Sequence, residues 1–300
     1  MDIKELENIL NGTKYEAYIG HIDYVELNGY KYNDLFKAGN ANIGFLAFKI
    51  RENDNQNRYA VSSIENIAVM KDKDNFINKY KDIIEKDEHI LMVSEWLNGF
   101  QPIQKNRENL PQFFSFLAEF NKQNIVKENF TSMYAYGNHF GTIDDLVNWE
   151  INYHKKYFQE IIENIEILDT LNYLKNGLAC VILEDMNTGN LFITDDGKYK
   201  YIDMDWIING LNLYQFEKID YFGFEERQNY NINAEAKECY IAYFETLGIK
   251  KEEANNQIRA FELLQVLRTN TCLIYHGDNS YNKEEIKNRI KIVIGHKYFM

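Results

Sequence analysis

Three residues whose side chains carry oxygen ligands occur close together in the segment LEDMNTGNLFITDDGKYKYIDMD, residues 183–205. Asp185 comes first, Asn190 follows five residues later, and Asp203 follows after thirteen more. Carboxylate and amide oxygens are hard ligands, and they suit Mg²⁺ that is bound together with phosphate oxygens. These residue types therefore favour phosphate chemistry supported by a divalent cation.

The elements around these residues should bring them together. Short strands are expected at 191–194 and 200–202, and the Asp-Asp-Gly turn signal between them predicts a β-hairpin. The hairpin would return Asp203 to the edge from which Asn190 departs. A tight glycine turn just before Asn190 would place it back towards Asp185, so we expect the three side chains to converge. The alternative is that they are only turn-favouring residues around a hairpin.

The first hundred residues read mostly as strands. An Asn-Gly pair at 28–29 is a hairpin signal, and a second turn follows at Gly39. A polar stretch, Lys79–Lys86, is interpreted as helical. The expected strands are Tyr18–Leu27, Tyr32–Ala38, Ile43–Ile50, Ile90–Val93 and Glu95–Leu97, with a helix at Val61–Met70.

The remaining residues show mainly the 3.6-residue apolar period of helices. Both prolines of the chain follow soon after Gly99, and glycine and proline are typical of turns and loops. Gly99 is therefore the best candidate for the boundary between two lobes. We therefore predict an α+β protein with a small β-rich lobe, residues 1–98, and a larger helical lobe, residues 99–300, with a cleft between them. The expected helices are Leu110–Asn124, Leu146–Leu174 as more than one helix, Ala234–Thr246, Glu253–Thr269 and Lys283–Ile294, with a short apolar run at Leu178–Leu183.

The pattern Asp-x-x-x-Gly-Asn followed by Ile-Asp-x-Asp resembles the catalytic and metal-binding loops of the aminoglycoside phosphotransferase and choline kinase group. These are small-molecule kinases with a protein-kinase-like fold. The resemblance implies that two-lobe fold, Mg²⁺, and ATP or GTP as phosphate donor. It implies that Asp185 is the catalytic residue, which accepts or orients the proton of the substrate hydroxyl, and that Asn190 and Asp203 hold Mg²⁺.

The resemblance also extends to the nucleotide side of such a site. Lys49 lies on the third expected strand, as the phosphate-binding lysine of the group does, and Glu65 lies sixteen residues later, where it would fix that lysine. The segment Val93–Gly99 resembles the hinge, whose backbone would hold the purine, with Ser94 and Trp96 as candidate contacts. Without the resemblance, Lys49 and Glu65 read as solvated side chains and Trp96 as a core residue.

Two departures from the group's pattern leave alternatives open. Leu183 stands where the group usually has a histidine, two residues before the catalytic aspartate, and the first hairpin has no Gly-x-Gly-x-x-Gly loop. They motivate a second hypothesis, a non-catalytic nucleotide-binding or regulatory protein on the same fold. A protein kinase is less favoured because His-Arg-Asp, Asp-Phe-Gly and Ala-Pro-Glu are absent, and a P-loop kinase because GxxxxGK[ST] is absent.

The composition indicates which kinds of molecule the protein is expected to bind. The chain has 33 Lys and Arg against 46 Asp and Glu, a net charge of −13, which disfavours a nucleic-acid binder. The resemblance implies that the acceptor is an aminoglycoside, choline, ethanolamine, or a sugar or amino sugar. The acidic balance favours a cationic acceptor among these. Carboxylates that could line its site are Asp205, Asp220 and Glu225, and the alternative is a solvated acidic face.

The remaining expectations concern the cellular setting. No apolar run is long enough for a membrane span, and the charged start shows no secretory signal. The three cysteines, Cys180, Cys239 and Cys272, show neither disulfide nor zinc spacing, so we expect a cytoplasmic protein. We expect a monomer or a homodimer that binds a nucleotide and a small acceptor, without nucleic-acid or membrane partners.

Overall fold

The computed structural model describes residues 2–27, 30–54, 63, 66–71, 73–97, 100–103, 107–132, 134–135, 137–184, 186, 189–194, 196–202, 206–217, 234–277 and 282–299. The chain divides into two compact units, each considered separately below. Unit 1 consists of residues 1–65, 72–101 and 192–205, and unit 2 of residues 66–71, 102–191 and 206–300. The boundary predicted near Gly99 stays a prediction, because Gly99 lies outside the described residues.

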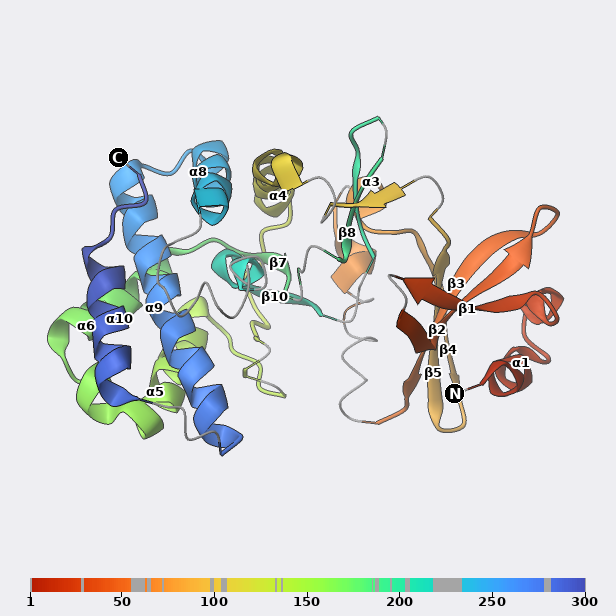
Figure 1. The fold of residues 1–300 in the computed structure, drawn as a ribbon, viewed down its shortest axis with the longest axis horizontal. Helices are drawn as coiled ribbons and strands as arrows, with labels where there is room; N and C mark the ends of the chain where they lie inside the picture. Colours follow the sequence, from red (N-terminus) through yellow and green to blue (C-terminus); the bar gives the residue numbers. More distant parts are fainter. Residues whose placement is uncertain are drawn as a thin grey trace. The chain divides into compact units, whose positions relative to one another are not determined.

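Unit 1 is built on an antiparallel sheet (Figure 1). In the described residues this sheet has five strands in the order β1-β2-β3-β5-β4, so β3 lies at its centre. The expected strands of the first lobe are therefore present, except the one at Glu95–Leu97. That prediction is wrong, because β5 ends at Glu95 and residues 96 and 97 are not in a strand. Their bounds are β1 Ile22–Leu27, β2 Tyr30–Asn40, β3 Gly44–Glu52, β4 Tyr80–Lys86 and β5 His89–Glu95, with helices α1 Ile3–Leu10 and α3 Lys73–Phe76.

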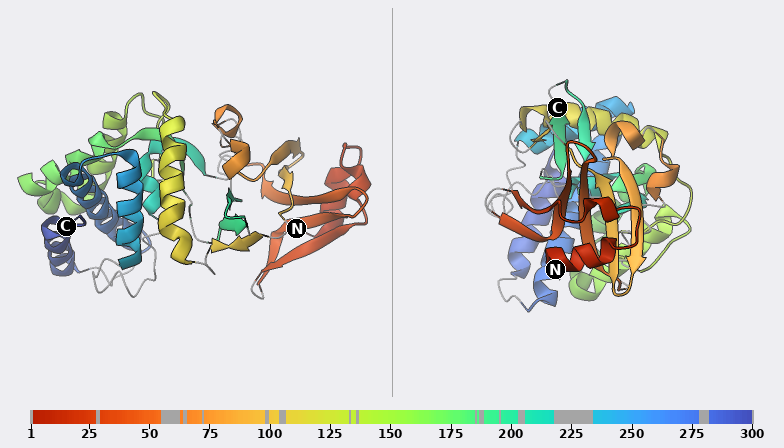
Figure 2. Two further views of the ribbon diagram at one scale, coloured as in Figure 1. Left: turned by 90° about the horizontal axis from the view of Figure 1, so that it is seen from above. Right: turned by 90° about the vertical axis from the view of Figure 1, so that its right-hand side faces the viewer.

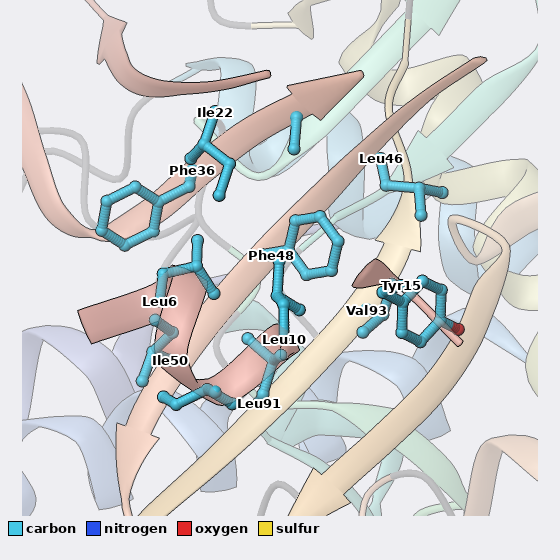
Figure 3. Close-up of a cluster of buried hydrophobic side chains, with 12 residues drawn as sticks. Leu6, Leu10, Tyr15, Ile22, Phe36, Leu46, Phe48, Ile50, Leu91 and Val93 are labelled. Carbon is cyan, nitrogen blue, oxygen red and sulfur yellow. The ribbon is translucent and has the colours of Figure 1, made fainter. Parts of the chain in front are cut away.

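Helix α1 covers one face of this sheet, and its side chains meet those of β3 (Figure 3). The helix starts with a capping box: the Glu5 N–H donates to Asp2, and the Asp2 N–H donates to Glu5. On β3, alternate residues are buried as the two-residue period of a strand requires. The buried face of β3 consists of Leu46, Phe48 and Ile50, which pack with Leu6 and Leu10 of α1.

The helical interpretation of Lys79–Lys86 is wrong, because residues 80–86 form strand β4. Lys86 pairs with His89 across a tight turn in which Asp87 has φ 55°, so β4 and β5 form a hairpin. β4 is the last strand of the sheet, and edge strands tolerate charged side chains on both faces. The polarity that suggested a solvated helix therefore belongs to an edge strand.

A second small sheet in unit 1 contains the predicted hairpin. Strands β8 Leu191–Thr194 and β9 Tyr199–Tyr201 are neighbours in it, together with β6 Phe100–Pro102. The turn is closed by Thr194 N–H donating to the Lys198 carbonyl at 2.9 Å, and Gly197 takes φ 79°, which glycine adopts without strain. This hairpin was predicted from the sequence and is confirmed.

Unit 2 is mostly helical. Helix α4 packs against α8, and α9 packs against α6 and α10 (Figure 2). The expected break within Leu146–Leu174 lies between α5 and α6. The bounds are α4 Leu110–Gln123, α5 Ile143–Ile162, α6 Ile165–Asn172, α8 Ala234–Leu247, α9 Lys251–Tyr275 and α10 Lys283–Gly295, with an antiparallel pair of strands, β7 Ala179–Leu183 and β10 Ile207–Leu211. Within the described part of the chain, no helix has the length and apolarity that crossing a bilayer requires.

Candidate functional site

Two predicted site residues lie near the end of β7 and the beginning of β10, the paired strands of unit 2. Leu183 pairs with Ile207, and one residue further the Glu184 N–H donates to the Trp206 carbonyl at 3.0 Å. Asp185 directly follows Glu184 in the chain, and Asp205 directly precedes Trp206. Both aspartates lie outside the described residues, but their chain neighbours are joined by a backbone hydrogen bond.

The two residues predicted to hold Mg²⁺, Asn190 and Asp203, flank the β8–β9 hairpin in the chain. The half-buried Asn190 comes directly before β8, after an exposed Gly189, whereas Asp203 comes two residues after β9 and lies outside the described residues. One connection runs from β7 to β8 and carries Asp185 and Asn190; the other runs from β9 to β10 and carries Asp203 and Asp205. The two connections therefore link the same two pairs of strands.

Lys49 lies on β3, on the face opposite the one that α1 covers. It is half-buried, and it stands between the buried residues Phe48 and Ile50 in the strand. Across the sheet, Lys49 is in register with Met92 of β5 on one side and with Leu35 of β2 on the other. A lysine on the central strand, with paired strands on both sides, has a backbone that cannot shift independently of the sheet.

Ser94 and Trp96 lie at the end of β5 and just after it. Ser94 is half-buried and in register with Ala47 of β3, which in turn is in register with Lys37 of β2. The Lys37 ammonium lies 5.0 Å from the centroid of the Trp96 ring and 4.5 Å from that of Phe45. This cation–π contact places the Trp96 ring beside Lys37, at the end of the row formed by Lys37, Ala47 and Ser94.

The backbone of the expected hinge already makes hydrogen bonds within unit 1. The Trp96 N–H donates to the Phe45 carbonyl at 3.2 Å, and the Glu95 carbonyl accepts from Asn78 Nδ2 at 2.8 Å. The Glu95 side chain lies 2.5 Å from the Lys81 ammonium. These contacts fix the chain where β5 ends, directly before the remaining hinge residues.

Several other predicted positions lie outside the described residues: Glu65, Asp185, Asp203, Asp205, Asp220 and Glu225. Their roles stay predictions. In the ranges that are described, no group of three or more His, Cys, Asp or Glu side chains is arranged to hold a metal ion.

Unit 2 contains a buried charge cluster that the sequence interpretation missed. The guanidinium of Arg268 on α9 lies 2.6 Å from Glu150 Oε1 on α5 and 2.7 Å from Glu217 Oε2, which follows β10. The rings of Tyr134 and Tyr214 each lie with their centroids 4.3 Å from the guanidinium carbon. We call Arg268, Glu150, Glu217, Tyr134 and Tyr214 the arginine cluster.

A signal for part of this cluster was present in the sequence. In α5, Glu150 and His154 occupy positions of the stripe formed by Ile143, Leu146, Val147, Ile151 and Phe158, and all of these residues are buried. Polar residues on an apolar stripe indicate buried side chains with partners. Here Ser132 donates to Glu150 at 2.7 Å, and His154 Nδ1 lies 2.9 Å from the Thr271 hydroxyl. Burial, together with the nearby Arg268, lowers the pKa of His154 to about 3.

Comparison with known proteins gives a consistent answer for the fold. No family model matches the chain, and no curated protein matches it either. Among solved structures, a thermostable mutant of aminoglycoside phosphotransferase APH(4)-Ia in complex with AMP-PNP and hygromycin B has a TM-score of 0.61 at 14% identity, covering 97% of this chain and 99% of that one.

The fold is that of the protein-kinase-like small-molecule kinases. A putative fructosamine-3-kinase from Haemophilus somnus has a TM-score of 0.55 at 14% identity, with 97% of each chain covered. Choline kinase LicA from Streptococcus pneumoniae has a TM-score of 0.52 at 11% identity, covering 97% of this chain and all of that one. The predicted α+β class and the resemblance to this group are thereby confirmed for the kinase-like fold.

Proposed function

We propose that this protein is a Mg²⁺-dependent kinase that transfers the γ-phosphate of ATP or GTP to a hydroxyl of a small cationic molecule. The observation that carries the proposal is that two connections of the chain join the same two pairs of strands. Residues 184–190 and 202–206 link the same two strand pairs, and they contain Asp185, Asn190 and Asp203, the three residues that the sequence singles out for phosphate chemistry. The kinase-like fold supports the same assignment.

The donor set fits the metal that the proposal needs. Asn190 offers an amide oxygen and Asp203 a carboxylate, and Mg²⁺ prefers oxygen ligands of this kind with phosphate oxygens completing its shell. When bound, Mg²⁺ neutralises charge on the phosphates. Such local neutralisation is needed because the chain has a net charge of −13 and the donor is itself an anion.

The residues of the chain supply the remaining steps. Lys49 would contact the α- and β-phosphates, with Glu65 fixing its side chain. Asp185 would accept the proton of the acceptor hydroxyl while the hydroxyl oxygen forms a bond to the γ-phosphorus. The bond from that phosphorus to the bridging oxygen then breaks, and the nucleoside diphosphate leaves. Such transfer depends mainly on positioning and on stabilisation of charge.

The acceptor class follows from charge. An ammonium group in a binding site needs carboxylate or aromatic partners. Asp205, Asp220 and Glu225, which follow the predicted Mg²⁺ residue Asp203 in the chain, are the candidate carboxylates. We therefore expect aminoglycosides, choline, ethanolamine or amino sugars to be better acceptors than neutral or anionic alcohols.

The test is a screen for phosphate transfer from radiolabelled ATP and GTP to these acceptors, with the wild type and Asp185→Asn side by side. We expect acceptor-dependent transfer with the wild type, and none above background with the variant. Thermal shifts with Mg²⁺ and nucleotide are measured in parallel. A Mg²⁺-dependent nucleotide shift without transfer to any acceptor would favour the non-catalytic binding protein instead.

A further inference from the structure

Strand β7 leads directly to Asp185, and its two edges are held differently. One edge pairs with β10 along its whole length. On the other edge the Val126 N–H donates to the Ala179 carbonyl at 3.1 Å, and the Val181 N–H donates to the Asn124 carbonyl at 2.9 Å. Among the described residues, the backbone pairing on this second edge reaches no further towards Asp185 than Val181.

Side-chain amides continue the pairing where that backbone partner ends. Asn121 of α4 donates from Nδ2 to the Val181 carbonyl at 3.1 Å, and Gln215 accepts the Leu183 N–H on Oε1 at 3.3 Å. On the β10 edge, before the strand begins, Asn212 accepts the Leu178 N–H on Oδ1 at 2.9 Å, and its own N–H donates to the Leu178 carbonyl at 2.9 Å. All three amide side chains are fully buried. We call Asn121, Asn212 and Gln215 the amide network.

Hydrogen bonds within the amide network fix the orientation of each member. Gln215 Nε2 donates to Asn121 Oδ1 at 2.9 Å and to the Asn212 carbonyl at 3.1 Å. The Tyr243 hydroxyl donates to Asn121 Oδ1 at 2.9 Å and accepts from Asn212 Nδ2 at 3.1 Å. Each amide uses both its NH₂ group and its oxygen, so turning one over would set acceptor against acceptor.

The network acts on the last residues before the predicted catalytic aspartate. Leu183 is fully buried and apolar, so its backbone N–H is the polar group through which Gln215 holds it. One residue later, Glu184 N–H is bonded to the Trp206 carbonyl on the opposite edge. The chain is thus held from both edges immediately before Asp185.

We propose that the amide network positions Asp185, with Gln215 as its central positioning residue. This inference rests on the proposed function. At its position beside Leu183, Gln215 supplies both groups that the hydrogen bonds need: an oxygen that accepts the Leu183 N–H, and an NH₂ group that donates to Asn121 and Asn212. Because it does not touch substrate in this role, its loss should affect turnover more than nucleotide binding.

The experiment compares Gln215→Met with a matched control. Methionine keeps the length and burial of the side chain but removes both hydrogen-bonding groups. Asn255→Leu is the control, since Asn255 is also a buried amide: it accepts the N–H groups of Tyr298 at 2.7 Å and Phe299 at 3.0 Å, remote from β7 in the chain. Gln215→Asn, which keeps the amide and shortens the side chain, is the second variant should Gln215→Met fail to fold.

Two readouts are needed. For Gln215→Met we expect kcat to fall about tenfold to a hundredfold, the scale of a misplaced reacting group, with the nucleotide KM changed less than about twofold. Hydrogen exchange of the Leu183 amide should accelerate by about tenfold, since its hydrogen bond to Gln215 is lost. Gln215→Asn should shift both quantities in the same direction by less, and Asn255→Leu should leave both unchanged.

Faster Leu183 exchange with an unchanged kcat would overturn the positioning role. An equal fall in kcat for Asn255→Leu would overturn it too, because the effect would then be one of general stability. A wild type without any transfer activity would overturn the proposed function and with it the catalytic purpose of the network. The exchange measurement would in that case still decide whether the amides hold the end of β7.

Discussion

Arg268 and Glu150 form an ion pair in the interior of unit 2, with 2.6 Å between Nη2 and Oε1 and no exposed surface on either side chain. The second carboxylate, Glu217, lies 2.7 Å from Nη1 of the same guanidinium, so one positive charge is shared by two negative ones. The pair joins α5 to α9, and Glu217 links both helices to the segment that follows β10. Burying charges is costly unless they are paired, so this arrangement depends on all of its members.

Loss of the arginine should therefore destabilise the fold strongly. We expect Arg268→Met to lower the free energy of unfolding by about 3–5 kcal/mol, because Glu150 and Glu217 stay buried without their partner. Urea denaturation would measure the change. Arg259→Met is the control: Arg259 is half-buried and donates to the His296 carbonyl, and its loss should cost about 1 kcal/mol. Equal effects of the two variants would contradict this account.

His154 should make stability depend on pH on the acid side. Its pKa in the fold is about 3, below the ordinary value of 6.5, so the unfolded chain binds a proton at His154 more readily than the folded chain does. Stability from this group is complete above pH 6.5 and falls by about 1.4 kcal/mol per pH unit as the pH drops towards 3. His154→Gln, which does not titrate, should flatten the profile between pH 4 and 6.5. A profile that keeps its slope would mean that His154 is not the responsible group.

Lys49 should matter for nucleotide binding and little for folding. We expect Lys49→Met to weaken ATP or GTP binding by about tenfold or more, since a hydrogen bond to a charged group contributes about 1.5–3 kcal/mol. Calorimetry with Mg²⁺ and nucleotide would measure this. Arg51→Met removes a positive charge from the same strand and the same face, where Arg51 pairs with Asp34, and it should bind nucleotide as the wild type does. Equal binding by Lys49→Met and wild type would remove Lys49 from the site.

Asn190 should set the metal requirement. We expect Asn190→Ala to raise the Mg²⁺ concentration for half-maximal phosphate transfer by at least about tenfold, the scale found when groups around a bound metal are removed. Chelation of Mg²⁺ should stop transfer by the wild type, and added Mg²⁺ should restore it. Transfer that is independent of Mg²⁺ in both proteins would contradict the assignment of Asn190.

The local sequence pattern correctly predicted those helices and strands whose periodicity or turn residues agree with their place in the fold. Helix α4 and the β8–β9 hairpin are examples, because a 3.6-residue period and an Asp-Asp-Gly turn specify them within a few residues. The pattern failed for Lys79–Lys86. Its polarity reflects its place at the edge of a sheet, and that place depends on pairing with β5. Helix α1 was not predicted, although its capping box was present in the sequence.

The sequence by itself determined the α+β class, the resemblance to small-molecule kinases, and the candidates Asp185, Asn190, Asp203 and Lys49. Motif spacing and local periodicity carry that information within short stretches of chain. Only the tertiary structure decided which polar residues are buried together. Arg268 meets Glu150 across 118 residues, and Gln215 meets Asn121 across 94. A buried polar group is stable only beside its partner, and partners this far apart in sequence are brought together only by folding.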